Sequence, residues 1–280
     1  MEATLVGTTG PGSASAQARK QIEAGCDLIL AAGGDGTINE VAAGMLHSRV
    51  PLALLPGGTA NVLARETRVP IDMLAAVRDL SKMVPTRVAT GLLRAGGKEQ
   101  RSFLCMAGAG LDAEIVTHVN LDLKAAVGKL AYYVGGFSQV FRSLPEFEVT
   151  IDGKAYEASF ALISRVRNYG GDLEIARGAS LLLNEFQVVL FRGKHCLRYL
   201  PYLAAVSLRF AEKMNGCTFV HGRSVTCKSA TGQGVFVQVD GELVGTLPIS
   251  AEIVPDSLTL LLPPAFVAKE QSAMDIRACA

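Results

Sequence analysis

A glycine loop, Gly33-Gly34-Asp35-Gly36-Thr37, follows an apolar run at 28–32 and precedes a segment, 38–46, whose apolar residues have helical spacing. This order predicts a strand, a loop and a helix. Glycines let the backbone approach a ligand closely, and the first amides of the helix direct N–H groups and a partial positive charge towards it. We therefore expect the loop to bind phosphate or another anion.

Asp35 makes this loop more specific. A carboxylate inside a phosphate cradle repels its ligand unless a cation or a transferred proton lies between them. We interpret the loop as a site for a metal-bound nucleoside phosphate. The alternative is a glycine-rich turn in which Asp35 only caps the following helix.

Composition limits the class of protein. With 280 residues, 49% of them hydrophobic, the chain is long enough for one large or two ordinary domains with buried sheets. Its 27 basic residues nearly balance its 26 acidic residues, so charge gives no reason to expect nucleic-acid binding.

The N-terminus has no basic region before an apolar stretch, and no uncharged run approaches the roughly 20 residues that span a bilayer. We expect a chain that is not exported and works in the cytoplasm. The six cysteines lack the paired short spacing of zinc sites, so we expect reduced thiols.

The first part of the chain alternates strand and helix patterns. Strands are expected at 3–6, 27–32 and 52–55, and helices at 14–24, 37–47 and 60–66. A second glycine loop, Pro56-Gly57-Gly58-Thr59, follows the third strand. Because parallel strands place their carboxyl ends at one edge of a sheet, the two glycine loops should face the same crevice.

From about residue 86 the pattern changes to short strands separated by turns, and we expect an antiparallel, β-rich domain at 86–280 after an α/β domain at 1–85. Asp152-Gly153 and Asp240-Gly241 are signals for hairpins with type I′ turns. Helices are expected at 112–142 and 195–212; the second is amphipathic and basic, so it either packs on the sheet or touches a membrane. The expected strands are 87–95, 102–107, 147–151, 156–163, 186–191, 218–221, 225–228, 235–239 and 258–262.

Taken together, the two loops at 33–40 and 56–61 resemble the diacylglycerol kinase catalytic domain, and most closely its bacterial branch, which also looks like sphingosine kinases. The segments at 107–112, 168–171 and 239–242 support the resemblance, which covers essentially the whole chain in order. The first loop alone is shared with NAD kinases, so the combination of segments is what makes the resemblance specific.

The resemblance implies an α/β nucleotide-binding domain with a parallel, Rossmann-like sheet, a β-sandwich domain, and an active site in the cleft between them. It implies an ATP-dependent lipid kinase that moves the γ-phosphoryl group of Mg·ATP to a hydroxyl of diacylglycerol or a sphingoid-type lipid. Glu242 matches the general base, and Asp35 would help to position Mg·ATP. A glutamate after a tight turn is rigidly presented, which suits this chemistry.

The resemblance also implies further contacts. Mg²⁺ would be held by Asp35 and by Asp240, although Asp240 is equally well explained as a turn residue. The expected partners are a lipid substrate and, transiently, the membrane surface; nucleic acid is not expected, and a homodimer is left open. The residues implied to bind the nucleotide are Thr8, Gly34, Asp35, Gly36, Thr37, Asn39, Glu40, Gly58 and Thr59.

The chain departs from the family pattern in several places. It starts one strand and one helix later than the family, so that part of the ATP site is expected to be missing. Val88-Ala89-Thr90-Gly91 has alanine where relatives have an aspartate of the metal network, and Val62 replaces another aspartate. The loop that holds a structural magnesium in the family corresponds to Leu182-Leu183-Asn184, where we expect no metal.

These departures leave alternatives open. One is a nucleotide- or lipid-binding relative without turnover, and a less favoured one is an NAD kinase. His118 and His221 have no partner at motif spacing, so we interpret each as a surface or core residue rather than a catalytic one.

Overall fold

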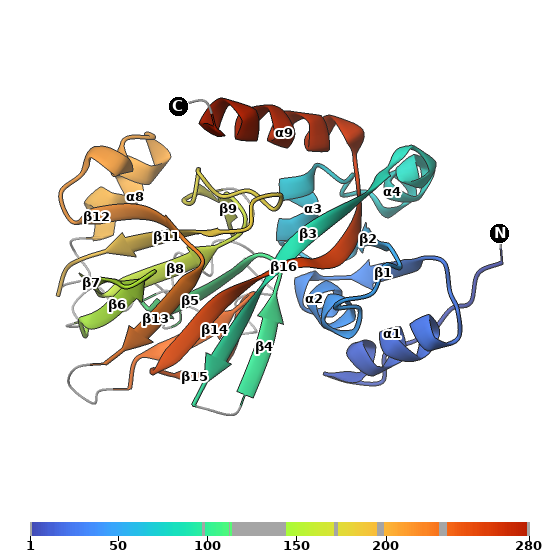
Figure 1. The fold of residues 1–280 in the computed structure, drawn as a ribbon, viewed down its shortest axis with the longest axis horizontal. Helices are drawn as coiled ribbons and strands as arrows, with labels where there is room; N and C mark the ends of the chain where they lie inside the picture. The colour runs from blue at the N-terminus through green and yellow to red at the C-terminus, as the bar shows by residue number, and fades with distance from the viewer. Residues whose placement is uncertain are drawn as a thin grey trace. The chain divides into compact units, whose positions relative to one another are not determined.

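The computed structural model describes residues 2–96, 99–111, 113, 144–170, 173–194, 199–229 and 234–278. The chain forms two compact units (Figure 1). Unit 1 comprises Met1–Thr90 and Pro255–Ala280, and unit 2 comprises Gly91–Val254. None of the helices in the described ranges is long and apolar enough to cross a membrane.

Unit 1 is built around parallel strands, as predicted for the start of the chain. Residues pair in register from Ile29↔Leu52 to Gly33↔Pro56, and Leu260↔Leu52 continues the parallel pairing. Its elements are α1 (Ser13–Glu23), β1 (Ile29–Gly33), α2 (Asp35–Gly44), β2 (Leu52–Pro56), α3 (Val62–Thr67), α4 (Met73–Asp79), η1 (Leu80–Lys82), the start of β3 (Val84–Ala95), the end of β16 (Ile249–Leu262) and α9 (Pro264–Ala278).

Burial explains this arrangement. Every residue of β2 is buried, which is why the strand reads as a continuous apolar run rather than an alternating one. Helices α1 and α2 pack against each other so closely that a Cβ added to Gly44 would lie 2.3 Å from the Ser15 carbonyl oxygen. Glycine at position 44 therefore permits the helix contact.

Two local expectations for unit 1 need correction. The predicted strand at 3–6 is wrong: residues 2–9 form neither helix nor strand, and Leu5 is 99% exposed. A short apolar run becomes a strand only when a neighbouring strand satisfies its backbone groups. Helix α4 was not predicted, although it begins with a good capping residue, since the Asp72 carboxylate accepts from the Ala75 amide at 2.8 Å.

The end of the chain belongs to unit 1, whereas the predicted division assigned everything after residue 85 to the β-rich domain. The guanidinium of Arg87 explains the difference, because it donates to the Asp256 carboxylate at 2.6 Å and to the Thr259 hydroxyl at 2.9 Å. The Ser257 hydroxyl also donates to that of Thr90 at 3.0 Å. These bonds tie the C-terminal strand to residues 87–90 and move the boundary into β3 and β16.

Unit 2 is an antiparallel β-sandwich, as predicted. Its six-stranded sheet has the order β12-β11-β8-β5-β14-β15, and the second sheet contains β4, β3, β16, β13, β6 and β7. The remaining bounds are β4 (Glu99–Phe103), β5 (Met106–Gly110), β6 (Phe147–Ile151), β7 (Lys154–Ala158), β8 (Phe160–Ser164), β9 (Asn168–Tyr169), β10 (Leu173–Glu174), β11 (Phe186–Phe191), α8 (Tyr199–Ser207), η3 (Ala211–Lys213), β12 (Cys217–Gly222), β13 (Ser224–Lys228), β14 (Phe236–Val239) and β15 (Glu242–Thr246).

The core of the sandwich joins both sheets. Phe103 of β4 stacks on Phe186 of β11 with ring centroids 5.6 Å apart. A Cβ on Gly91, which pairs with Phe103 across β3 and β4, would lie 2.1 Å from the Phe103 ring. The ring therefore covers the glycine of the neighbouring strand and fills the space that a side chain would take.

Both predicted Asp-Gly hairpins are confirmed. Asp152 and Gly153 have φ of 45° and 86°, and Asp240 and Gly241 have φ of 46° and 86°, the left-handed values that a type I′ turn requires. The predicted strands at 102–107 and 156–163 each divide in two, and β15 was not predicted.

The predicted helices of the second domain are only partly covered. The helix at 112–142 lies outside the described residues apart from residue 113. Residues 195–198 of the second helix also lie outside them, and α8 forms its middle part. That helix ends at Ser207, and Arg209 with φ of 64° breaks the helical path before residue 212.

Candidate functional site

The two glycine loops of unit 1 lie at one edge of the sheet and touch each other. The Gly57 amide donates to the Gly33 carbonyl at 2.8 Å. A Cβ on Gly58 would lie only 2.6 Å from the Gly34 Cα atom. The predicted shared edge is thus confirmed, and glycine is needed at position 58 because a side chain there would meet the backbone of the first loop.

Asp35 connects the loops in a way that the sequence did not predict. It is the first residue of α2, whose N-cap is Gly34, so the alternative in which Asp35 caps its own helix is wrong. Its carboxylate accepts from the Val62 amide at 2.7 Å, which places it at the start of α3. Burial raises the pKa of Asp35, and the amides of Val62, Leu63, Asn61 and Asp35 itself oppose that effect.

Asn61 closes the second loop. Its side chain is buried, its backbone is left-handed with φ of 47°, and its amide group both accepts from the Gly58 N–H and donates to the Gly58 carbonyl, each at 2.8 Å. Asparagine tolerates this backbone conformation better than most residues. Asn61 lies in the 56–61 motif, and the tendency of asparagine towards left-handed backbone was the signal in the sequence for this role.

Thr37 belongs to the first loop by contact. A Cβ on Gly33 would lie 2.8 Å from the Thr37 Cβ atom, so the threonine side chain covers that glycine. Thr59 is exposed beside Gly58, and Thr8 is exposed in the segment before α1. The first turn of α2 holds Gly36 and Thr37, whose amides point out of a helix start as phosphate binding requires.

Glu40, predicted to contact the nucleotide, makes two backbone contacts within unit 1. Its carboxylate accepts from the Gly12 amide at 2.8 Å and from the Ala14 amide at 3.4 Å. These amides form the start of α1, so Glu40 fastens α1 to α2 and offsets the partial charge of that helix end. Asn39, on the same helix, is half-buried.

Asp240 of unit 2 is a structural acceptor. Its carboxylate accepts from the amides of Leu104 at 3.1 Å, Cys105 at 3.2 Å and Met106 at 2.8 Å, at the break between β4 and β5. Of the two explanations that the sequence left open for Asp240, these bonds favour the turn residue over the metal ligand. Within the described residues, no three His, Cys, Asp or Glu side chains are grouped so that they could hold a metal ion.

Glu242 follows this turn as the first residue of β15. Its side chain is 57% exposed, and one carboxylate oxygen lies 3.6 Å from the Arg101 guanidinium. The Gly241 amide donates to the Gln238 side chain at 2.8 Å, which stiffens the turn. Glu242 is thus an accessible carboxylate on a rigid support, which suits the transfer of a proton.

The structure describes the neighbours of two positions at which the chain departs from the family pattern. Ala89 is buried in β3. At the Leu182-Leu183-Asn184 loop, the buried guanidinium of Arg165 donates to the carbonyls of Leu181 at 2.7 Å, Leu183 at 2.5 Å and Glu185 at 3.2 Å. Burial lowers the pKa of Arg165 to about 10. The loop carbonyls therefore surround a cation that the chain itself supplies.

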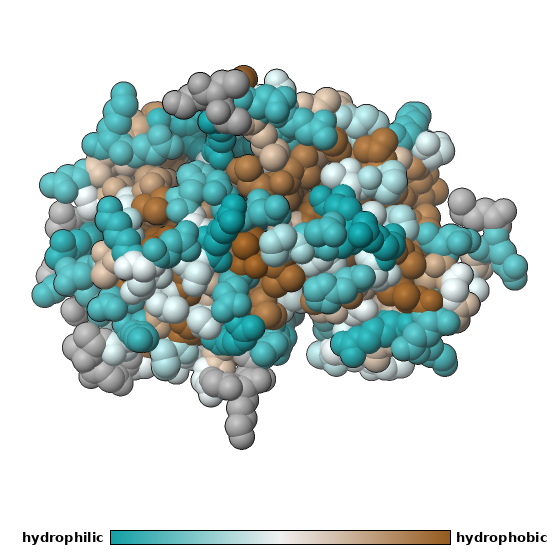
Figure 2. Space-filling view, in the orientation of Figure 1, coloured by the Kyte–Doolittle hydropathy of each residue, from teal (hydrophilic) through white to brown (hydrophobic). Residues whose placement is uncertain are grey.

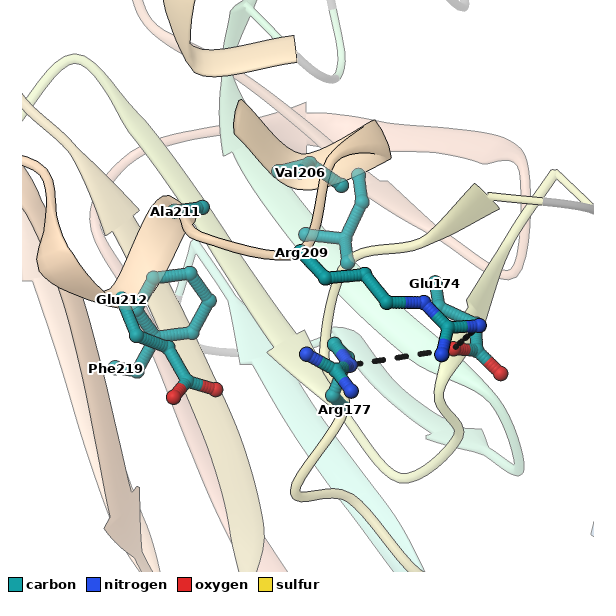
Figure 3. A pocket seen from close by; sticks show the side chains of 8 residues that line it. Glu174, Arg177, Val206, Arg209, Ala211, Glu212 and Phe219 are labelled. Carbon is teal, nitrogen blue, oxygen red and sulfur yellow. Dashed lines mark ion pairs between the residues drawn. The ribbon is translucent and has the colours of Figure 1, made fainter. Parts of the chain in front are cut away.

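Other polar groups lie outside the predicted site. His221 contacts the Glu185 carboxylate at 2.9 Å, while His118 lies outside the described residues. A small hollow near α8 holds Arg177 and Arg209, which both approach the carboxylate of Glu174, at 4.0 and 3.7 Å (Figure 3). Glu212 also lines the hollow, so two carboxylates balance the two arginines and no surplus of positive charge is left for an anion.

The comparisons with known proteins agree with this geometry. The family described as "Diacylglycerol kinase catalytic domain" matches residues 1–93. The family described as "YegS C-terminal NAD kinase beta sandwich-like domain" matches residues 105–262. The two matches cover the glycine loops and the sandwich with its Asp240-Gly241 turn.

Individual relatives also resemble this chain over most of its length. A diacylglycerol kinase of Bacillus subtilis (strain 168) is 30% identical over 88% of this chain and 81% of the relative. One from Staphylococcus saprophyticus is 27% identical over 88% of this chain and 80% of its own length. A crystal structure of a diacylglycerol kinase from Bacillus anthracis str. Sterne superposes with a TM-score of 0.74 at 23% identity, covering 93% of this chain and 85% of that one, which establishes the fold.

Proposed function

Because the chain belongs to the diacylglycerol kinase catalytic-domain family, we propose that it transfers the γ-phosphoryl group of Mg·ATP to the hydroxyl of a lipid of diacylglycerol or sphingoid type. The observation that carries the proposal is the direct contact between the two glycine loops, with the Asp35 carboxylate joining α2 to the start of α3. Such a contact brings the second glycine loop beside the first turn of α2, whose amides suit the binding of phosphate.

The phosphate groups bind to backbone rather than to side chains in this proposal. The residues assigned to this task are Gly34, Gly36 and Thr37. Gly58 and Thr59 lie beside the phosphates, since the Gly58 amide already donates to the Asn61 side chain, and Thr8 contacts the nucleotide. Asp35 acts by keeping the second loop at a fixed distance from the first. Mg²⁺ enters with ATP as part of the substrate in this proposal, because Mg²⁺ keeps several waters and is bound largely through substrate phosphates.

Glu242 is assigned as the general base. Its carboxylate takes the proton of the lipid hydroxyl as the hydroxyl oxygen bonds to the γ-phosphorus. The bond from that phosphorus to the bridging oxygen breaks, and ADP leaves with the electron pair. The proton on Glu242 then passes to water. The exposure of Glu242 supports this role, because the acceptor can reach the carboxylate.

The test is a transfer assay with the full chain, radiolabelled Mg·ATP, and mixed micelles containing diacylglycerol, monoacylglycerol, sphingosine or ceramide, with NAD as a separate acceptor. We expect a labelled lipid, and a loss of about 10²-fold or more in kcat for Glu242→Gln. Leu243→Gln, at the neighbouring exposed position, is the matched control. Labelling of NAD alone, or full activity of Glu242→Gln, would overturn the proposal.

A second candidate is a nucleotide- or lipid-binding protein without turnover. The engagement of Asp240 with three backbone amides and the alanine at position 89 favour it, because both remove carboxylates from a metal network. In that case titration calorimetry would show ATP binding that Glu242→Gln leaves unchanged, and no acceptor would be labelled.

A further inference from the structure

Helix α4 of unit 1 exposes an apolar surface. Only Ala76 is buried among the residues of this helix. The exposed fractions are 38% for Ile71, 39% for Met73, 67% for Leu74 and 45% for Val77. Hydrophobic colour gathers over this part of unit 1 in Figure 2. Leu74 and Val77 are three residues apart, so they share one face of the helix.

Basic residues border this surface. Arg68 and Arg78 are exposed, and the Lys82 side chain is 73% exposed. The nearby acidic groups have local partners, since Asp72 accepts from the Ala75 amide at 2.8 Å and Asp79 pairs with Lys82 at 2.7 Å. Arg68, Arg78 and Lys82 against Asp72 and Asp79 leave a net charge of +1 at the edge of the apolar surface.

We propose that Ile71, Met73, Leu74 and Val77, with Arg68 and Arg78 at their edge, form a docking surface for an anionic bilayer. Apolar side chains on one helical face enter the boundary between headgroups and acyl chains, while the bordering arginines meet anionic headgroups. The inference deepens the proposed function and rests on it for the lipid substrate, which must be taken from a membrane.

A second apolar surface, at the end of α8, is the comparison. Leu208 is 71% exposed and Phe210 is 42% exposed, both within the segment 195–212 that the sequence predicts either to pack on the sheet or to touch a membrane. Arg209 between them pairs with Glu174 at 3.7 Å, so less positive charge is left there for headgroups. The α4 surface therefore has the better match of charge to an anionic bilayer.

The test measures sedimentation of the full chain with vesicles, in the absence of ATP. One set is phosphatidylcholine alone, and the other contains equal parts of phosphatidylcholine and phosphatidylglycerol. We expect binding to the anionic vesicles that weakens with salt, and about tenfold weaker binding for the double variant Leu74→Glu, Val77→Glu. Ile276→Glu, at a 69% exposed position of α9 in the same unit, should bind like the parent.

Activity provides a second measurement. The double variant should keep its activity on a short-chain diacylglycerol dispersed as monomers and lose activity on the same headgroup embedded in anionic vesicles. If no lipid is labelled in either form, the proposed function fails while the vesicle result still stands. The variant Leu208→Glu measures, in the same vesicle assay, how much the α8 surface contributes to binding.

Several outcomes would overturn the docking surface. They are unchanged vesicle binding of the double variant, an equal loss in Ile276→Glu, or a dimer in gel filtration that the double variant dissolves without a change in vesicle binding. Thermal unfolding of each variant checks the fold. Leu74→Gln with Val77→Thr replaces the double variant if the glutamates prevent folding, and it should weaken vesicle binding in the same direction.

Discussion

The paired glycine loops of unit 1 and the Asp240-Gly241 hairpin of unit 2 both use a carboxylate to hold backbone amides of another segment. Asp35 accepts from the start of α3 and has a raised pKa, because burial opposes its ionised form. Asp240 accepts from three successive amides, and the next acidic residue, Glu242, stays exposed. Acidic residues of a motif thus divide into those that accept backbone amides and those that stay exposed, and our proposal gives a substrate contact only to the exposed one.

Glu242→Ala should have the largest effect and should act on activity alone. We expect kcat to fall by about 10²–10⁴-fold, since the group that receives the hydroxyl proton is lost. The urea midpoint should stay within error of the parent, because the side chain is exposed. A large drop in stability would instead place Glu242 among the structural carboxylates.

Asp240→Ala should show the opposite pattern. Three amides lose a charged acceptor, so we expect about 3 kcal/mol lower free energy of unfolding by urea titration. Asp152→Ala is the matched control, because Asp152 begins the other Asp-Gly turn and accepts from the amides of Arg223 and Ser224 at an exposed site. If Asp240→Ala is no more costly than Asp152→Ala, the structural role of Asp240 is wrong.

Gly58→Ala tests the contact between the loops. The added methyl would meet the Gly34 Cα atom at 2.6 Å, so the loops must move apart. We expect about 1–3 kcal/mol of destabilisation and weaker ATP binding by calorimetry. Gly234→Ala, where a Cβ would meet nothing closer than 3.8 Å, should change neither quantity. Unaltered ATP binding in Gly58→Ala would separate the loop contact from the phosphate site.

Asp35→Asn should have the smallest effect, and one that depends on pH. Since the folded pKa of Asp35 is raised, its contribution to stability is present below the unfolded pKa and is lost as pH rises through the folded pKa. The asparagine variant has no such loss, so its stability relative to the parent should rise from acid pH to a plateau. Urea titrations across this pH range would contradict the assignment if the relative stability fell instead.

The sequence predicted the parts of the fold that depend on local patterns. The glycine loops, the two Asp-Gly turns and most strands of the sandwich follow from spacing and turn chemistry. The partner of the Asp240 carboxylate could not be predicted, because residues 104–106 lie far away along the chain and contain no recognisable signal. The contact of Glu40 with the Gly12 amide could not be predicted either, because nothing in the motif indicates that Glu40 joins α2 to the start of α1.

Long-range pairing also decided the domain boundary. Residues 258–262 read as one more strand of the β-rich part, and nothing local indicated that Arg87 would hold Asp256 and Thr259 in unit 1. Arg165 gave an even weaker signal, since an arginine at the end of a strand is usually exposed. A buried charge can be predicted only when the groups that surround it are known.

Arg165 has a consequence for how the sandwich keeps its shape. The carbonyls of Leu181, Leu183 and Glu185 converge on a positive charge, as they would on a bound ion, but this charge is attached to the chain. A tethered cation has no dissociation constant, so a chelator cannot remove it and its occupancy does not follow the ion content of the surroundings. The guanidinium of Arg165 therefore stays bound to the loop at 181–185 for as long as the unit is folded.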